Sequence, residues 1–243
     1  MKPLASLKQP ANPVLIFWIA IGLVGFFAVP WYGVEDFFKF EWLIDGYPFD
    51  ADYAPAAFLL GQAEKLWLAP LILPLLAPFA VLLKRKSDPL YARVLIVAGA
   101  IGLGWIILQG FSIGIRGWNF DWLQVFFGDL NDRQYGMGYG GMLVAVAFLF
   151  LFTQGIAARG AINGDVFVVS SISGIVVIVT IFVFFPIAKM LTAAFITDGG
   201  GYSLSVFASK FFDDRLWGLG CLSGGRCGVA WNSLFLAVLV GLI

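Results

Sequence analysis

The stretch VFVVSSISGIVVIVTIFVFFPI, residues 166–187, contains no charged side chain and is long enough to cross a lipid bilayer. A membrane-spanning helix needs about 20 consecutive residues that are mostly apolar. Elsewhere the charged residues also lie between long apolar stretches rather than within them. The same criterion predicts further spans at residues 13–32, 66–83, 94–115 and 137–158, and a sixth apolar run begins near Gly228 and continues to the last residue given, Ile243. The sequence therefore predicts an all-α integral membrane protein, a multi-span helical bundle of about six transmembrane helices.

The composition agrees with a membrane location. Hydrophobic residues make up 60% of the 243 residues and charged residues only 12%, and the mean hydropathy is +0.91, outside the range of soluble globular proteins. The formal net charge is zero, and without a basic patch we expect no binding of nucleic acid. The sixth span has no polar flank after it, so we expect a truncated last helix and an amino-terminal fragment of a longer protein.

The basic residues predict the orientation in the membrane, because Lys and Arg are retained on the cytoplasmic side. Three alternate segments carry basic residues with few acidic ones: the amino-terminal tail with Lys2 and Lys8, the loop 84–93, and the turn at Arg159. The loop 33–65 is acidic and is expected to face outward. We therefore expect a multi-pass protein of a bacterial inner membrane, with its amino terminus in the cytoplasm.

The residue inventory argues against an enzyme. The chain has no histidine, which excludes Ser-His-Asp and Cys-His nucleophile pairs and a histidine-held haem. We expect no catalytic residue, no metal ligand and no cofactor. The only cysteines, Cys221 and Cys227, lie in the last outward loop. On the oxidising side of the membrane they are expected to form a disulfide, with two free thiols as the alternative. A zinc site would lack two ligands.

Several glycines and aromatic residues have structural interpretations. Residues 136–141 fit G-x-G-x-x-G by letter, but a dinucleotide site needs a strand before the motif and a soluble helix after it. We expect these glycines, and the pair Gly110 and Gly114, to allow close helix packing. The segment 203–217 is predicted to form a short interfacial helix. Tryptophans near the span ends, Trp31 and Trp67 among them, are expected to be interface anchors.

Short motifs follow one another in an order that resembles a known family. They are Phe184-Phe185-Pro186-Ile187 at the end of the fifth span, Ala194-Phe195, and Ala230-Trp231-Asn232-Ser233-Leu234 at the start of the sixth. In this order they resemble the amino-terminal edge of the permease core of type I ABC importers. Further motifs make nearly the whole chain similar to a subgroup of bacterial permeases for ferric iron uptake: residues 114–122, 134–138 and 217–227.

The resemblance implies a division and a function. Residues 1–165 would be a four-span extension, and 166–243 the incomplete start of the permease core. Such a subunit passes a solute, here expected to be ferric iron, from a periplasmic binding protein to the cytoplasm, and a separate ABC ATPase powers it. The family's ATPase-docking loop of the E-A-A…G type is missing from the expected cytoplasmic segments. As given, the chain is therefore not expected to couple ATP hydrolysis to transport. No residue of the substrate pathway is assigned.

Two other classes of function remain open from the residues alone. An integral membrane enzyme acting on a lipid-linked substrate would lose turnover, without loss of folding, when single loop carboxylates or arginines are substituted. A non-catalytic scaffold would tolerate every loop substitution but would be sensitive at Gly110 and Gly114. Either would show the same spans and outward loops.

Overall fold

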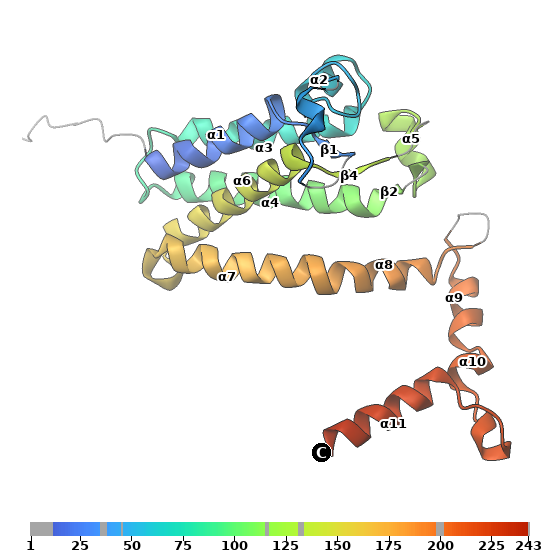
Figure 1. Cartoon of the computed structure of the whole chain (residues 1–243). Coiled ribbons are helices and arrows are strands. Elements are labelled where there is room, and N and C mark those ends of the chain that lie inside the picture. The colour runs from blue at the N-terminus through green and yellow to red at the C-terminus, as the bar shows by residue number, and fades with distance from the viewer. Residues whose placement is uncertain are drawn as a thin grey trace, which may run out of the picture. The chain divides into compact units, whose positions relative to one another are not determined.

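The computed structural model describes residues 12–34, 38–44, 46–114, 117–130, 134–197 and 202–242 (Figure 1). Lys2 and Lys8 of the amino-terminal tail, Ile115 at the end of the predicted third span, and Arg116 of the motif 114–122 lie outside these ranges. Nearly all regular structure is helical, as predicted, and the strands are only two residues long. The chain divides into two compact units, Met1–Ile178 and Val179–Ile243. Each unit is described by itself below.

The first unit contains three long helices joined by short helical turns, and two small antiparallel strand pairings. Strand β1 pairs antiparallel with β4, and β2 pairs with β3. The elements in chain order are α1 (Pro13–Phe27), β1 (Tyr32–Gly33), η1 (Glu41–Leu43), α2 (Ala56–Gly61), η2 (Leu66–Leu71), α3 (Ile72–Leu76), η3 (Ala77–Val81), α4 (Pro89–Ser112), β2 (Ile113–Gly114), β3 (Gly117–Trp118), α5 (Asp121–Phe127), β4 (Gly136–Met137), α6 (Tyr139–Ala158), η4 (Ala161–Gly164) and α7 (Val166–Val179).

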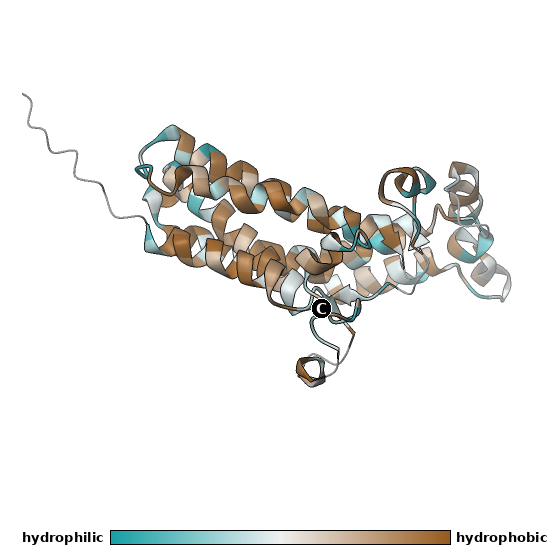
Figure 2. Cartoon of the chain, turned by 90° about the horizontal axis from the view of Figure 1, so that it is seen from above, coloured by the Kyte–Doolittle hydropathy of each residue, from teal (hydrophilic) through white to brown (hydrophobic). Residues whose placement is uncertain are grey.

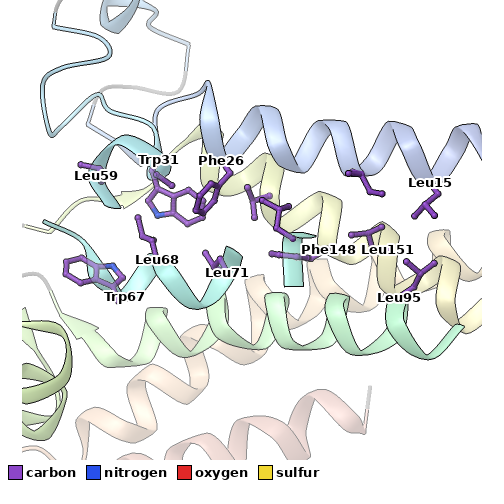
Figure 3. Packing of buried hydrophobic residues seen from close by; sticks show 14 of the residues in the cluster. Leu15, Phe26, Trp31, Leu59, Trp67, Leu68, Leu71, Leu95, Phe148 and Leu151 are labelled. Carbon is purple, nitrogen blue, oxygen red and sulfur yellow. The ribbon is translucent and has the colours of Figure 1, made fainter. Parts of the chain in front are cut away.

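Helix α6 packs against both α1 and α4 and forms the centre of this unit. The core between the helices contains Leu15 and Phe26 of α1, Leu95 of α4, and Phe148 and Leu151 of α6 (Figure 3). All five side chains are almost fully buried. A close-packed core of this kind gives the bundle one defined arrangement.

Glycines let the three helices approach closely. A Cβ atom added to Gly99 of α4 would lie 2.7 Å from the carbonyl oxygen of Phe148, and one added to Gly155 of α6 would lie 2.9 Å from that of Ala92. At Gly140 it would lie 2.6 Å from the carbonyl oxygen of Gly25 in α1. Close packing is thus confirmed at Gly140, within the G-x-G-x-x-G stretch. The prediction of close helix packing is wrong for Gly114, because this residue lies in β2, beyond the end of α4.

The predicted second span, residues 66–83, is not one regular helix. It consists of η2, α3 and η3, which together cover Leu66–Val81. Pro70, Pro74 and Pro78 recur every fourth residue and each removes a backbone N–H donor. Neighbouring groups hold the broken segment in place: the Trp105 Nε1 and Gln109 Nε2 atoms of α4 both donate to the carbonyl oxygen of Trp67, at 2.8 and 3.3 Å.

Among the described residues, three helices are long and apolar enough to cross a membrane: Pro89–Ser112, Tyr139–Ala158 and Val166–Ala193. The other apolar helices, Pro13–Phe27, Leu66–Val81 and Val229–Gly241, are shorter. Three of the about six predicted spans therefore have the length and apolar composition of a membrane helix, and the other three are shorter. The first helix ends at Phe27 rather than at residue 32, because Pro30 disfavours helical backbone at the residue before it. Figure 2 shows the apolar character of the helices along their length.

The second unit begins inside the longest helix, Val166–Ala193. This helix is widened to a π-turn before Pro186, whose ring nitrogen cannot donate a hydrogen bond. The expected interfacial segment 203–217 is a helix broken at residues 212–213, where the Asp213 side chain caps a new turn. The elements are η5 (Thr180–Phe184), α8 (Phe185–Ala193), α9 (Leu204–Phe211), α10 (Asp214–Trp217), η6 (Gly220–Ser223) and α11 (Val229–Gly241).

Candidate functional site

The first unit contains a polar cavity of about 540 Å³ where its loops meet. The lining comes from three segments far apart in the sequence: β1, the stretch between residues 50 and 65, and the stretch between 129 and 135. The lining residues are Tyr32, Asp50, Ala51, Asp52, Glu64, Lys65, Asp129, Leu130, Gln134 and Tyr135. We take this cavity as the candidate functional site because it is large enough for a small solute.

Backbone hydrogen bonds fix the walls of the cavity. Strand β1 is held by β4 through the register Tyr32 to Met137. The Asp50 amide donates to the carbonyl oxygen of Gly46 at 2.9 Å, and the Asp52 amide donates to the Asp50 carboxylate at 3.0 Å. Such an Asx-type turn is a local structure that aspartate favours. The site is therefore built by loops that are tied to the helix ends.

Negative charge dominates the lining. Asp50, Asp52, Glu64 and Asp129 contribute carboxylates, and Lys65 is the cationic side chain among the lining residues. The Lys65 ammonium lies over two aromatic rings, 5.8 Å from the centroid of Tyr32 and 5.3 Å from that of Trp67. Carboxylates that line a concave site attract cations to it.

The lining offers polar groups that can bind a solute. Among the described residues, no group of three or more His, Cys, Asp or Glu side chains is arranged to hold a metal ion. Burial of the Tyr32 hydroxyl raises the pKa of this phenol above its ordinary value. The lining can thus accept hydrogen bonds from a cationic or polar solute at its carboxylates.

A smaller cavity of about 160 Å³ shares Tyr32 with the first. Its lining is mostly aromatic and apolar, with Lys39 as its charged residue. The residues are Pro30, Tyr32, Gly33, Val34, Lys39, Trp42, Tyr53, Met137, Gly138 and Tyr139. Gly138 lies so close to the backbone of Tyr32 that a Cβ atom there would overlap it. The glycine stretch 136–141 thus shapes this wall.

Of the residues singled out in the sequence, the motif 134–138 contributes Gln134 and Tyr135 to the larger cavity and Met137 and Gly138 to the smaller one. The two cysteines lie elsewhere. Cys221 and Cys227 are bonded to each other in the second unit, with 4.6 Å between their Cα atoms, and the Asn232 side chain donates to the Cys227 carbonyl oxygen at 3.2 Å. In the first unit the acidic loop 33–65 served only to predict orientation, yet it supplies half of the cavity lining. The signal that could have found it is the grouping of Asp50, Asp52 and Glu64 beside Lys65.

Two tryptophans next to the site have a different role from the one predicted. Trp31 and Trp67 are 3% and 1% exposed and belong to the core, so the prediction that they are interface anchors is wrong. Trp31 lies edge-on to Phe26, with 6.1 Å between the ring centroids. Large aromatic rings that are fully enclosed contribute strongly to packing. Trp31 and Trp67 thus belong to the core directly beside Tyr32 and Lys65, which line the cavity.

Comparison of the chain with protein-family models, with curated proteins and with solved structures finds no match in any of the three. The resemblance to type I ABC importer permeases therefore stays a prediction from the motifs of the sequence.

Proposed function

We propose that the chain is a membrane-embedded permease subunit of an ABC importer, located in a bacterial inner membrane with its amino terminus in the cytoplasm. In this proposal it passes a solute, ferric iron as the first expectation, from a periplasmic binding protein toward the cytoplasm. A separate ATPase supplies the energy. Residues 1–165 would be the extension, and the part from residue 166 would belong to the permease core.

One observation carries most of the support from the structure: the longest apolar helix is left almost uncovered. Only 6% of the most apolar window of Val166–Ala193 is buried, against 50% for α6. Its side chains Ile175, Phe182 and Phe184 are all more than half exposed. A permease core consists of several helices packed around a pathway, and its first helix by itself would show such open sides.

Length explains how this helix can hold Lys189 without placing a charge in the hydrocarbon. At 1.5 Å per residue its 28 residues extend about 42 Å, more than the roughly 30 Å of the bilayer core. Lys189 lies near the carboxyl end, with its ammonium 5.9 Å from the centroid of the Phe185 ring. A lysine there reaches the interface with its long side chain.

The polar cavity agrees with a role on the receiving side of the membrane. The proposed orientation places the loop 33–65, and with it Asp50, Asp52 and Glu64, on the outer face. Carboxylates in a concave outer site would raise the local concentration of a cationic solute. This contribution is secondary, because the resemblance and not the cavity points to iron.

The test is recovery of partners together with uptake. The protein is tagged at its chromosomal locus, extracted in a mild detergent after cross-linking, and its partners are identified by mass spectrometry. We expect an ABC ATPase and a periplasmic solute-binding protein, and loss of radiolabelled ferric iron uptake in a deletion strain. Complementation with the unmodified gene should restore uptake. A preparation without any ATPase, from a strain with normal uptake of all tested solutes, would contradict the proposal.

A further inference from the structure

The short helix α5 presents an apolar face that nothing in the described chain covers. Trp122, Val125 and Phe126 are 60%, 85% and 71% exposed. They share one side of the helix, because residues three and four apart are neighbours on a helix surface. The rings of Trp122 and Phe126 lie edge to face, with 6.2 Å between their centroids. The face formed by Trp122, Val125 and Phe126 is thus continuous, and the exposed carboxylate of Asp121, four residues before Val125, borders it.

The other sides of α5 have distinct surroundings. Leu123 is buried, and the Phe127 ring lies 6.1 Å from that of Trp105 in α4 and 5.8 Å from that of Trp118 in β3. The Trp118 indole N–H also donates to the Gly128 carbonyl oxygen at 2.8 Å. Gln124, opposite the apolar face, is exposed, and its side-chain amide donates a hydrogen bond to the Asp129 carboxylate. One side is therefore anchored to the bundle, one is polar, and one is apolar and open.

The position of α5 indicates what covers the open side. Helix α4, a candidate membrane span, ends at Ser112, and only the β2–β3 hairpin separates it from α5. Figure 1 shows α5 at this same end of the bundle, beside β2. The last turns of α4 are themselves apolar and exposed at Ile107 and Leu108. Helix α5 therefore lies at the level where that candidate span ends, and its open apolar face adds to the exposed apolar surface at this end of the bundle.

We propose that α5 is an interfacial anchor that inserts Trp122, Val125 and Phe126 into the headgroup region of the bilayer. Tryptophan and phenylalanine rings at this depth meet apolar chains on one side and polar headgroups on the other. Helix α5 has no Lys or Arg, so its binding rests on apolar burial and does not need anionic lipid. The anchor fixes the hairpin, and through Asp129 one wall of the polar cavity, at the membrane surface.

The test places a fluorophore on each side of the same helix. Val125→Cys and Gln124→Cys are each made in a Cys221→Ser/Cys227→Ser background, labelled with bimane, and the full chain is reconstituted in phosphatidylcholine vesicles. Lipids with a doxyl group high on the acyl chain should quench the Val125 position about twofold more than the Gln124 position, as expected for a helix lying in the interface. Addition of anionic lipid should leave this ratio unchanged.

Two results would overturn the proposal. One is equal lipid quenching at the two positions. The other is stronger quenching by aqueous iodide at the Val125 position than at the Gln124 position, which would mean that the face is exposed to water and binds a soluble partner instead of lipid. Phe126→Asp combined with the Val125 reporter gives a second measurement, and lipid quenching should then fall to the Gln124 level. Both labelled positions are exposed, so folding is checked by circular dichroism and is expected to be retained.

Discussion

The two units of this chain bury their apolar residues to very different extents. In Met1–Ile178 the helices α1, α4 and α6 enclose a core of fully buried side chains, and glycines bring their backbones together. In the described part of Val179–Ile243, no hydrophobic side chain is buried, although α11 is apolar and the apolar helix Val166–Ala193 extends into this unit. The difference teaches that apolar sequence alone puts a helix in the membrane, whereas small residues at facing positions decide whether it packs within its own chain.

The largest difference in stability should come from removing one phenylalanine ring in each unit and comparing the two losses. Phe148 is fully buried between the helices, while Phe182 in η5 is 75% exposed. Phe148→Ala leaves a cavity and should destabilise the bundle by about 3 kcal/mol. Phe182→Ala should change stability by less than about 0.5 kcal/mol, because lipid or solvent replaces the ring. Reversible unfolding in mixed micelles measures both, and equal losses would contradict the contrast between the units.

The next effect sharpens the role of the glycines within α4. A Cβ at Gly99 would meet the backbone of Phe148 and Phe152, whereas one at Gly104 would meet nothing within 4 Å. Gly99→Ala should cost about 1–3 kcal/mol through forced separation of α4 and α6. Gly104→Ala should be neutral or slightly stabilising, since alanine favours a helix by up to about 1 kcal/mol. If Gly99→Ala were as stable as Gly104→Ala, close packing would not hold these helices together.

A smaller effect concerns the attachment of α7 to α6. Thr153 is buried, and its hydroxyl lies 2.9 Å from that of Ser170 on α7, while the Ser171 hydroxyl donates to the Phe167 carbonyl oxygen of its own helix. Interhelical bonds between hydroxyls in membranes are worth about 0.6 kcal/mol. Ser170→Ala should therefore cost about that amount, and Ser171→Ala nothing measurable. The same unfolding assay compares the two, and a larger loss at Ser171 would refute this account of the attachment.

The smallest effect on the bundle should come from the cysteine loop. Cys221→Ser should alter the stability of the first unit by less than about 0.5 kcal/mol, because the loop belongs to the second unit. Thiol labelling of the unmodified protein should be low without reductant and should rise after reduction. Equal labelling with and without reductant would mean that Cys221 and Cys227 are free thiols in the membrane.

The sequence predicted the helical class and the long spans, because these depend on runs of apolar residues that periodicity and length reveal. It failed at residues 66–81, where three regularly spaced prolines break the helix, although those prolines are visible in the sequence. The spacing of Gly110 and Gly114 predicted close helix packing at these two residues, whereas the structure has it at Gly99 and Gly155. A spacing rule cannot tell which side of a helix faces a neighbouring helix. The acidic grouping in the loop 33–65 marks one wall of the polar cavity, but the cavity as a whole could not be predicted, since it joins loops about 80 residues apart through the β1–β4 pairing.

The central claim is that the open helix Val166–Ala193 packs against other membrane helices of a transporter. Photo-cross-linking in living cells tests it most directly, with a benzoylphenylalanine residue placed at Phe182 and, as a partly buried reference at the contact between α4 and α6, at Phe152. The account predicts cross-links from position 182 to membrane helices of an ABC importer, and from position 152 only to helices of the same bundle. Cross-links from position 182 to lipid alone, in cells that contain the assembled importer, would contradict it.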